Sequence, residues 1–416
     1  MQSIKQAWQL MRENPLVSVI SILGTALSIA MILVVILTFQ ISNSGYPPES
    51  NRGRMLYVLG TEASPLEGRD GSRNRGQMSY EVVKECFYSL QTSEAVTAIT
   101  DNKNLPISLP AKRLFKEYSV KYTDDNFWRV FDFTFLNGKP FTEADFQSGI
   151  PNTVVTTEVA SKLFGNEEAL GKTIIINDIS YTIVGIVKPV SEKAQEAYAD
   201  VWIPCTSYPA MIKKSSYCDG IAGNFKTILL AHHPSDFKAI KEELEQRRVQ
   251  YNKGKRDMNV NFMGGPITRL EIATGSTGFQ NVPMKNYFLQ TGFLLLFMLL
   301  VPALNLIGFI LSSVEKRKEE VGVRKAFGAR GITIFRQILY ENLLTTIIGG
   351  IVGLLLSFLL LKLSSQFLLT AGMMIRPGLF VAALFFVLLL NLFSAGIPAM
   401  RIARQQIVNA LNKNEK

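Results

Sequence analysis

The stretch Ser313–Gln337 reads SVEKRKEEVGVRKAFGARGITIFRQ and lies between two long apolar segments. Seven positive charges stand in it against three negative ones: Lys316, Arg317, Lys318, Arg324, Lys325, Arg330 and Arg336 against Glu315, Glu319 and Glu320. Lys and Arg resist translocation, so a short loop that carries them stays on the cytoplasmic side of a membrane. The stretch therefore predicts a membrane protein in which 313–337 is a cytoplasmic loop between two spans.

Apolar residues and glycines are interspersed among these charges: Val321, Val323, Phe327, Ile332 and Ile334, with Gly322, Gly328 and Gly331. Glycines permit tight turns between short helical pieces. Two interpretations stay open from these residues alone. The apolar side chains either form a docking surface for a partner, or they dip into the lipid interface of a loop that only sets topology.

Four charge-free runs extend over 14–48, 286–314, 342–361 and 377–400. A helix needs roughly 20 apolar residues to cross a bilayer, so these runs predict four transmembrane helices. Before the first run, Ile4, Ala7, Trp8 and Met11 recur at helical spacing and predict an amphipathic helix on the inner leaflet. A signal peptide is the rival interpretation, but 16–39 is too long for its apolar core.

The segment 41–283 lies between the first two predicted spans and contains 28 Lys plus Arg and 28 Asp plus Glu. The formal excess of +10 therefore belongs to the membrane part and its cytoplasmic loops. A basic balance of this kind indicates membrane orientation and gives no sign of a nucleic-acid partner. We expect 41–283 to fold as a large domain outside the cytoplasm.

Hydrophobic periodicity predicts two βαβ units in this domain. The first combines strands at 55–59 and 95–100 with a helix at 79–90 that Ser79 caps. The second combines strands at 226–231 and 258–263 with a helix at 234–252 that begins on Pro234. The Gly/Arg/Ser-rich segment 62–77 is predicted to be a mobile loop.

The fold class follows as an α-helical membrane protein with four transmembrane helices and a large α+β extracytoplasmic domain between helices 1 and 2. The expected domains are 1–43 (amphipathic helix and helix 1), 44–120 with 221–282 (a porter-like subdomain of βαβ units), 121–220 (a β-rich insertion) and 283–416 (helices 2–4, the loop 313–337 and a tail). In the third span, Gly349, Gly350 and Gly353 with Ser357 predict a face where another helix approaches closely.

Candidate chemical sites are few. The glycine loop GNEEALGKT, 165–173, has five residues between its glycines where a Walker A loop has four, and it precedes a predicted strand, so we interpret it as a turn. His232 and His233 are adjacent and form no metal site alone. Cys86 falls on an apolar helix face, whereas Cys205 and Cys218 bracket a loop and are a candidate disulfide. No catalytic constellation or cofactor site is defensible, and we expect a non-enzyme.

Three stretches carry a family resemblance. EVGVRKAFGA at 320–329, followed by Gln337 and Glu341-Asn342, resembles the signature E-(I/V)-G-(I/V)-R-K-A-(L/I/M)-G-A of MacB/FtsX-type ABC transporter permeases. IPAMRIA at 397–403 with VNAL at 408–411 resembles the tail motif of the family, although Gln406 stands near its usual Pro. The segments 151–165, 171–174 and 181–187 resemble its extracytoplasmic domain.

The resemblance implies a bacterial inner-membrane permease, with a MacB-like periplasmic domain at about 41–283 and without the fused ATPase. It transmits the motion of a separate ABC ATPase to that domain, for export of a substrate such as a peptide, lipoprotein or drug. A homodimer or a heterodimer with a related permease, the lipid bilayer and a periplasmic adaptor are the other implied partners. The alternative is an FtsX-like signalling or scaffold protein that activates an extracytoplasmic partner without transport.

The resemblance also identifies the ATPase-coupling residues. They are Glu320, Val321, Gly322, Val323, Arg324, Lys325, Ala326, Phe327, Gly328 and Ala329. Val323 and Phe327 are the expected apolar anchors, and Arg324 and Lys325 are expected to steer orientation.

Overall fold

The computed structural model describes residues 15–43, 45–66, 71–110, 112–192, 194–213, 217–262, 264–276, 283, 285–294, 296–297, 300, 327, 331–363, 378 and 385. It divides into two compact units. One unit combines Met1–Gln40 with Phe288–Lys416, and the other is Ile41–Tyr287, close to the range expected to lie outside the cytoplasm.

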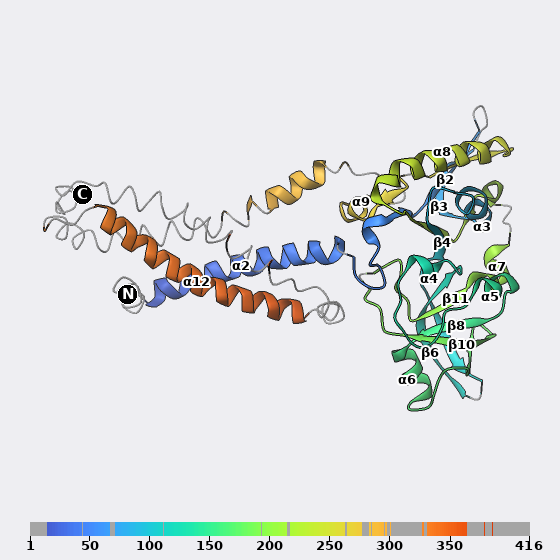
Figure 1. Cartoon of the computed structure of the whole chain (residues 1–416), viewed down its shortest axis with the longest axis horizontal. Helices are drawn as coiled ribbons and strands as arrows, with labels where there is room; N and C mark the ends of the chain where they lie inside the picture. The colour runs from blue at the N-terminus through green and yellow to red at the C-terminus, as the bar shows by residue number, and fades with distance from the viewer. Residues whose placement is uncertain are drawn as a thin grey trace. The chain divides into compact units, whose positions relative to one another are not determined.

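Among the described residues of the first unit are two long helices, α12 (Gly331–Leu363) and most of α2 (Pro15–Asn43) (Figure 1). Helix α12 begins before the predicted third span, so the last residues of the proposed cytoplasmic loop belong to a helix. Within the described part of the chain, no helix combines the length and the apolarity needed for a membrane crossing. The number of spans therefore stays a prediction.

The small-residue face of α12 packs against α2, as the sequence predicts. A Cβ atom on Gly353 would lie 2.7 Å from the carbonyl oxygen of Ala26, and one on Gly349 would lie 3.0 Å from Cβ of Thr25. Ile29 and Leu33 of α2 are buried in the same contact, with Leu354 against them. Glycine lets the two helix backbones approach closely here, and a larger side chain would push them apart.

A four-stranded antiparallel layer forms half of the second unit. Its strands are β1 (Met55–Val58), β4 (Ala95–Thr100), β13 (Phe225–Leu230) and β15 (Ile267–Thr268), in the spatial order β15-β1-β13-β4. Helices connect β1 to β4 and β13 to β15, so the layer is a split βαβ arrangement of the ferredoxin-like kind. We call it the ferredoxin-like layer.

The first crossover helix is short and partly irregular. It comprises α3 (Tyr80–Val82) and a π-helical turn, η2 (Val83–Phe87). Ser79 caps it by accepting from the amide of Val82, as predicted. The second crossover is η5 (Pro234–Asp236), which begins on Pro234, followed by α8 (Phe237–Lys253).

The two crossovers lie side by side on the layer (Figure 1). Arg247 of α8 donates to the carbonyl oxygen of Ser89 at 3.1 Å, and Glu243 accepts from the amides of Gln91 and Thr92. Both helices therefore cover one face of the sheet.

Two sequence expectations are wrong in this layer. The strand predicted at 258–263 is β14 (Met258–Asn261), but it pairs with β2 (Thr61–Pro65), and the two-residue β15 closes the second βαβ unit instead. The two ends of the segment predicted to be a mobile loop, 62–65 and 74–77, belong to β2 and to β3 (Asn74–Met78), which pair with each other. Cross-strand pairing of Glu62 with Arg75 at 2.7 Å stabilises strands whose composition is polar.

The β-rich insertion is a closed barrel. Its strands are β5 (Lys103–Leu109), β6 (Lys112–Thr123), β8 (Asn152–Thr156), β9 (Thr173–Ile176), β10 (Ile179–Val187) and β11 (Val201–Pro204). They follow the order β11-β8-β10-β9-β5-β6, and pairing of β11 with β6 closes the ring. Closure leaves these strands without a long open edge. Because β5 and β6 belong to this ring, the barrel begins at about residue 103, whereas the insertion is predicted to begin at residue 121.

Short elements decorate this framework. They are η1 (Arg52–Arg54), α4 (Phe127–Val130), β7 (Phe135–Gly138), α5 (Glu143–Ser148), α6 (Thr157–Phe164), η3 (Cys205–Ser207), α7 (Pro209–Ile212), η4 (Tyr217–Gly220), β12 (Ala222–Gly223) and α9 (Arg269–Ala273).

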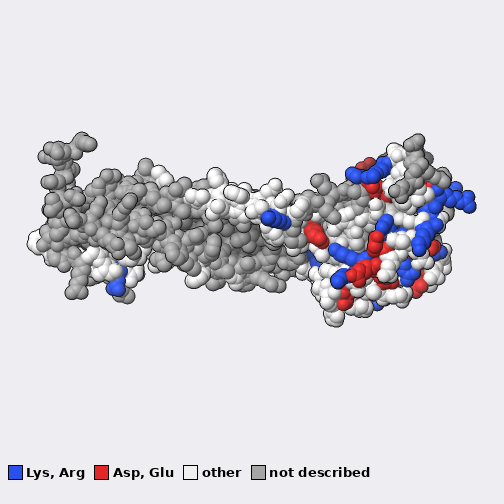
Figure 2. Space-filling view, turned by 90° about the horizontal axis from the view of Figure 1, so that it is seen from above, with Lys and Arg blue, Asp and Glu red and all other residues white. Residues whose placement is uncertain are grey.

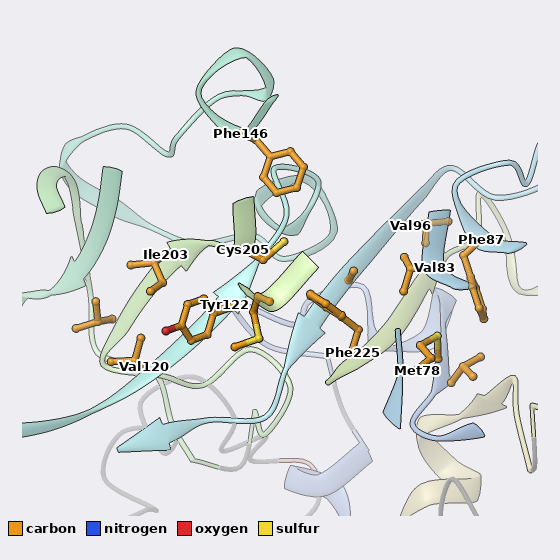
Figure 3. Close-up of a cluster of buried hydrophobic side chains, with 14 of the residues drawn as sticks. Met78, Val83, Phe87, Val96, Val120, Tyr122, Phe146, Ile203, Cys205 and Phe225 are labelled. Atoms are coloured by element: carbon orange, nitrogen blue, oxygen red, sulfur yellow. The ribbon is translucent and has the colours of Figure 1, made fainter. Parts of the chain in front are cut away.

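One hydrophobic core runs through the layer and the barrel. Figure 3 shows Met78 of β3, Val83 and Phe87 of η2 and Val96 of β4, and, on the barrel side, Val120, Tyr122, Ile203 and Cys205, with Phe225 of β13 between the two groups. All of these side chains are buried. The continuous core makes the layer and the barrel a single folded body.

Candidate functional site

The predicted ATPase-coupling segment Glu320–Ala329 lies outside the described residues, apart from Phe327. The Phe327 side chain is 89% exposed. An exposed Phe is available for burial against a partner, which is what the docking interpretation requires. The roles assigned to all ten residues, Phe327 included, stay predictions.

The glycine loop at 165–173 is a turn before a strand, as the sequence analysis concludes. Helix α6 ends before Gly165, and Thr173 begins β9 rather than a helix. Lys172 forms an ion pair with Glu167, and its ammonium lies 5.2 Å from the ring centroid of Phe164. The lysine therefore has structural contacts in the barrel, and no helix N-terminus is present at this point to bind a phosphate.

The three cysteines are free thiols in this structure. Cys86 and Cys205 are buried, and Cys218 is half-buried, so the candidate Cys205–Cys218 bond is not formed. Burial raises the pKa of Cys86 to about 12, which makes its thiol a poor nucleophile.

The histidines have separate local contacts. Nδ1 of His232 lies 3.8 Å from Glu94, while His233 occupies the cap of η5 with Asp236. In the described part of the chain, no group of three metal-ligating side chains comes together.

The structure reveals a buried charged cluster that the sequence analysis missed, in the segment that follows α2. Arg52 donates through Nε to Glu49 and through Nη2 to the hydroxyl of Tyr46 at 3.0 Å. Its guanidinium carbon lies 4.4 Å from the centroid of the Tyr46 ring. Glu49 is 1% exposed and Arg52 is 2% exposed. The chain therefore enters the ferredoxin-like layer through a fully buried ion pair.

Backbone turns place these side chains. The amide of Glu49 donates to the carbonyl of Tyr46 at 2.6 Å, and the amide of Arg52 donates to that of Glu49 at 3.1 Å. The turn continues into η1 and directly into β1. Consecutive turns bring Tyr46, Glu49 and Arg52 to one side of the segment, where their side chains meet.

The chain leaves the layer through β15 and α9, and this segment lies near the same cluster. Strand β15 pairs with β1 through Tyr57↔Ile267, and α9 follows it. A capping box fixes the start of α9, because Thr268 and Glu271 each bond the backbone of the other. Arg269, the first residue of α9, acts electrostatically on both Glu49 and Tyr46. We call Tyr46, Glu49, Arg52 and Arg269 the passage joint.

Burial dominates the electrostatics of the passage joint. It raises the pKa of Glu49 against the opposing charges of Arg52 and Arg269. Burial lowers the pKa of Arg52, but the neighbouring Glu49 and Tyr46 outweigh it and the net shift is upward. Among the described residues, Oε1 of Glu49 has no hydrogen-bond partner, so Arg52 holds only one of the two carboxylate oxygens.

A second buried carboxylate, Asp124, stands where the barrel meets the ferredoxin-like layer. Its Oδ1 accepts from Thr97 Oγ1 at 2.5 Å and from the Phe127 amide at 3.0 Å. Its Oδ2 accepts from the Ala98 amide at 2.8 Å and from the Tyr88 hydroxyl at 2.6 Å. The donors come from β4, from the end of the first crossover helix and from α4. We call this set the subdomain junction.

Burial raises the pKa of Asp124 to about 7, although its hydrogen bonds to Thr97, Tyr88 and Ala98 pull in the opposite direction. The other titratable groups near it are Asp125, Tyr80, Tyr88 and Cys205. Without its four donors the carboxylate would be still harder to ionise. The junction therefore ties two subdomains through one acidic side chain.

Two lysines extend this polar interface. Nζ of Lys121, on β6, donates to the carbonyl oxygens of Glu196 at 2.6 Å and Gln195 at 3.2 Å. Burial lowers the pKa of Lys121 to about 8. Lys226, on β13, lies 2.5 Å from Asp101 and 3.8 Å from the carboxylate of Glu196. The loop around Glu196 is thus bound from both subdomains.

A groove of about 390 Å³ lies beside α8 and the loop before β15. Its charged lining is largely engaged, since Arg248 pairs with Glu245 at 2.5 Å and Glu271 caps α9. On the face seen in Figure 2, positive and negative side chains are interspersed over the described surface of the second unit. No single-sign field therefore marks that face.

Two known protein families match successive parts of the chain. The MacB-like periplasmic core domain matches residues 18–247. The FtsX-like permease C-terminal domain matches residues 292–407. The two together define the class, which is a membrane permease with a periplasmic domain. The chain belongs to the MacB/FtsX-type permeases.

Curated relatives resemble the chain at low identity. The macrolide export ATP-binding/permease protein MacB 1 of Yersinia pestis is 22% identical over 413 residues, which cover 99% of this chain and 60% of the relative. The pyoverdine export ATP-binding/permease protein PvdT of Pseudomonas fluorescens is 22% identical over 418 residues, covering 98% and 59%. The chain thus spans about 60% of the length of these relatives.

Two solved structures resemble part of the chain. The periplasmic region of MacB from Actinobacillus actinomycetemcomitans matches with a TM-score of 0.37 and 16% identity, covering 55% of this chain and 95% of that one. The extracellular domain of the noncanonic ABC-type transporter YknZ from Gram-positive bacteria matches with a TM-score of 0.35 and 15% identity, covering 49% and 98%.

The residues that sequence reasoning missed had weak local signals. Glu49 and Arg52 are charged residues three apart, directly after Pro47-Pro48, and that spacing predicts a side-chain pair only if the backbone turns. Asp124 follows a strand and precedes a short helix, where Asp commonly bonds backbone amides. Neither pattern indicates burial, which depends on elements distant in the sequence.

Proposed function

We propose that this chain is the permease subunit of a MacB-type ABC transporter, which transmits the motion of an ATPase to a periplasmic domain and so extrudes a substrate. The observation that carries the proposal is the order of the two family matches, a MacB-like periplasmic core followed by an FtsX-like permease domain. The names of the relatives support export, since both are called ATP-binding/permease proteins of an export system.

The proposed arrangement has four transmembrane helices, both ends of the 416 residues in the cytoplasm and about 41–283 in the periplasm. Charge asymmetry supports this orientation, because the seven basic residues of 313–337 favour the cytoplasmic side. The permease acts as a dimer with a second copy or a related permease, and a periplasmic adaptor contacts the outer domain.

ATP hydrolysis belongs to a partner subunit in this proposal, and the chain itself is not an enzyme. The 416 residues contain no Walker A spacing, and the near match at 165–173 forms a turn occupied by an ion pair. The partner docks on Glu320–Ala329, with Phe327 as its central apolar anchor. The match to a MacB-like periplasmic core favours export over the FtsX-like signalling alternative.

The test is copurification of the ATPase with variants of the full chain. Burying a Phe side chain contributes roughly 1.5–3 kcal/mol, so Phe327→Ala should weaken binding of the ATPase about tenfold or more. Lys172→Ala is the matched control, because the ammonium of Lys172 pairs with Glu167 and lies near Phe164, both outside the docking segment.

The control should bind the ATPase as the parent does, and both variants should insert in the membrane. If Phe327→Ala copurifies with the ATPase at the affinity and the hydrolysis rate of the parent, the loop is a topology signal only. The docking role of Glu320–Ala329 is then lost.

A further inference from the structure

The passage joint combines burial, charge and position in a way that stability alone does not explain. Removing two charges from water opposes folding, and well-packed apolar residues often replace a buried pair without loss of stability. An apolar anchor would therefore hold the entering segment equally well. A buried ion pair differs from an apolar contact because each charged side chain needs a specific partner of opposite charge.

Only one of the two carboxylate oxygens of Glu49 accepts a hydrogen bond from the described residues. Arg52 binds Oε2, while Oε1 is buried and has no hydrogen-bond partner among the described residues. Leaving a buried acceptor unpaired destabilises the folded state, so each such group in a native structure calls for an explanation. Oε1 can therefore accept a hydrogen bond from a second donor.

Arg269 is a second cation near this carboxylate, since it follows Thr268, which pairs with Leu56 of β1. It begins α9 directly after β15, and its charge acts on both Glu49 and Tyr46. Arg52 and Arg269 belong to different passages of the chain, one entering the ferredoxin-like layer and the other leaving it. A shift of either passage therefore changes which guanidinium holds the carboxylate.

We propose that Glu49 is a positioning residue of a two-position latch, bound by Arg52 alone in one position and shared between Arg52 and Arg269 in the other. The latch rests on the proposed function, because it decides whether the two passages between the domain and the membrane part move independently or together. In the shared position the passages are tied, and ATP-driven motion reaches the layer through both at once. In the other position the tie is released.

The test uses the full chain in lipid nanodiscs with its ATPase bound. Arg269→Gln leaves the Glu49–Arg52 pair in place and removes the guanidinium of the second cation. We expect the ATP turnover of the assembled complex to fall roughly tenfold, a coupling of ordinary allosteric size, while the affinity for the ATPase stays within twofold. Arg269→Lys keeps the charge and should retain most of the turnover.

Two further variants separate the latch from general damage. Glu49→Gln should lower turnover as Arg269→Gln does, and the double variant should be no worse than either single one. Glu158→Gln breaks the exposed pair with Lys162 and should change nothing. Unchanged turnover in Arg269→Gln, or equal loss in Arg269→Lys and Arg269→Gln, overturns the latch.

Failure of the proposed function gives a different result. If the parent chain binds no ATPase, the permease proposal fails, and the latch is judged by a double-mutant cycle of Glu49→Gln and Arg269→Gln in urea unfolding of the full chain in detergent. Non-additive unfolding free energies support direct exchange between the two side chains. Additive values overturn it.

Discussion

Two buried carboxylates, Glu49 in the passage joint and Asp124 in the subdomain junction, lie in the same domain but differ in how many hydrogen bonds they accept. Asp124 accepts four hydrogen bonds, two on each oxygen, from three separate elements. Glu49 has Arg52 on one oxygen and no partner among the described residues on the other. Burial raises the pKa of both.

The difference between them lies in the partners rather than in the desolvation. A carboxylate with every acceptor position filled has one arrangement, so the barrel is held to the layer in one orientation. A carboxylate with a free acceptor has a second arrangement within reach. The number of carboxylate oxygens that accept hydrogen bonds thus separates Asp124, which holds one arrangement, from Glu49, for which we propose two.

The largest expected effect comes from breaking the ion pair at the passage joint. Arg52→Met removes the one hydrogen-bond partner that the described residues provide for the Glu49 carboxylate, and leaves that buried charge without its hydrogen-bonded cation. We expect a loss of about 3–5 kcal/mol in the free energy of unfolding. Urea unfolding of the full chain in detergent, followed by fluorescence of Trp128 and Trp202 in the second unit, measures it.

The double variant Glu49→Leu/Arg52→Met is the matched control, because it removes both charges and keeps apolar volume. It should recover most of the lost stability, since an apolar pair often replaces a buried ion pair without cost. A double variant as unstable as Arg52→Met would mean that the backbone turn, and not the charge, is what the substitution damages.

The second effect is a pH dependence at the subdomain junction. The pKa of Asp124 is raised from its ordinary value to about 7 by burial. A raised folded-state pKa gives a contribution to stability that is fully present below about pH 4 and is lost as the pH rises through 7. We expect a decline on the order of 2–4 kcal/mol across that window.

Asp124→Asn removes this titration while keeping the shape of the side chain. The decline in unfolding free energy between pH 4 and 7 should be smaller in the variant by the contribution of Asp124. Parallel pH profiles for the parent and Asp124→Asn would show that the carboxyl ionises in the folded domain as it does in the unfolded chain.

The smallest effect tests whether the four donors at Asp124 act together. Tyr88→Phe deletes the hydroxyl that bonds Oδ2 at 2.6 Å and leaves three donors in place. We expect a loss of about 1–2 kcal/mol in the same unfolding assay. A loss as large as that of Arg52→Met would mean that Asp124 is less well satisfied than its hydrogen bonds indicate.

The sequence predicts the periodic parts of this fold well. The strand at 95–100, the cap at Ser79 and the start at Pro234 depend on residues close in the chain, and the structure confirms them. Gly349 and Gly353 were predicted to form a helix-packing face and do so. Local patterns suffice wherever local contacts decide the structure.

Features set by distant residues could not be predicted in this way. Strand β15 has only two residues, too few for any periodic signal, and β14 joins β2 because Glu62 and its neighbours form strands that their polarity conceals. The passage joint and the subdomain junction likewise need residues far apart in sequence, such as Glu49 with Arg269 and Asp124 with Thr97. Hydropathy reports none of these pairings.

In the second unit, the barrel is inserted into the ferredoxin-like layer, and each of the two modules begins and ends on neighbouring strands. The ferredoxin-like layer begins and ends on neighbouring strands, since Tyr57 of β1 pairs with Ile267 of β15. The route through the barrel also begins and ends on neighbours, since Thr100 of β4 pairs with Phe225 of β13. Each module thus has both of its ends at one pair of neighbouring strands, while the shared core and the hydrogen bonds of Asp124 hold the two modules together.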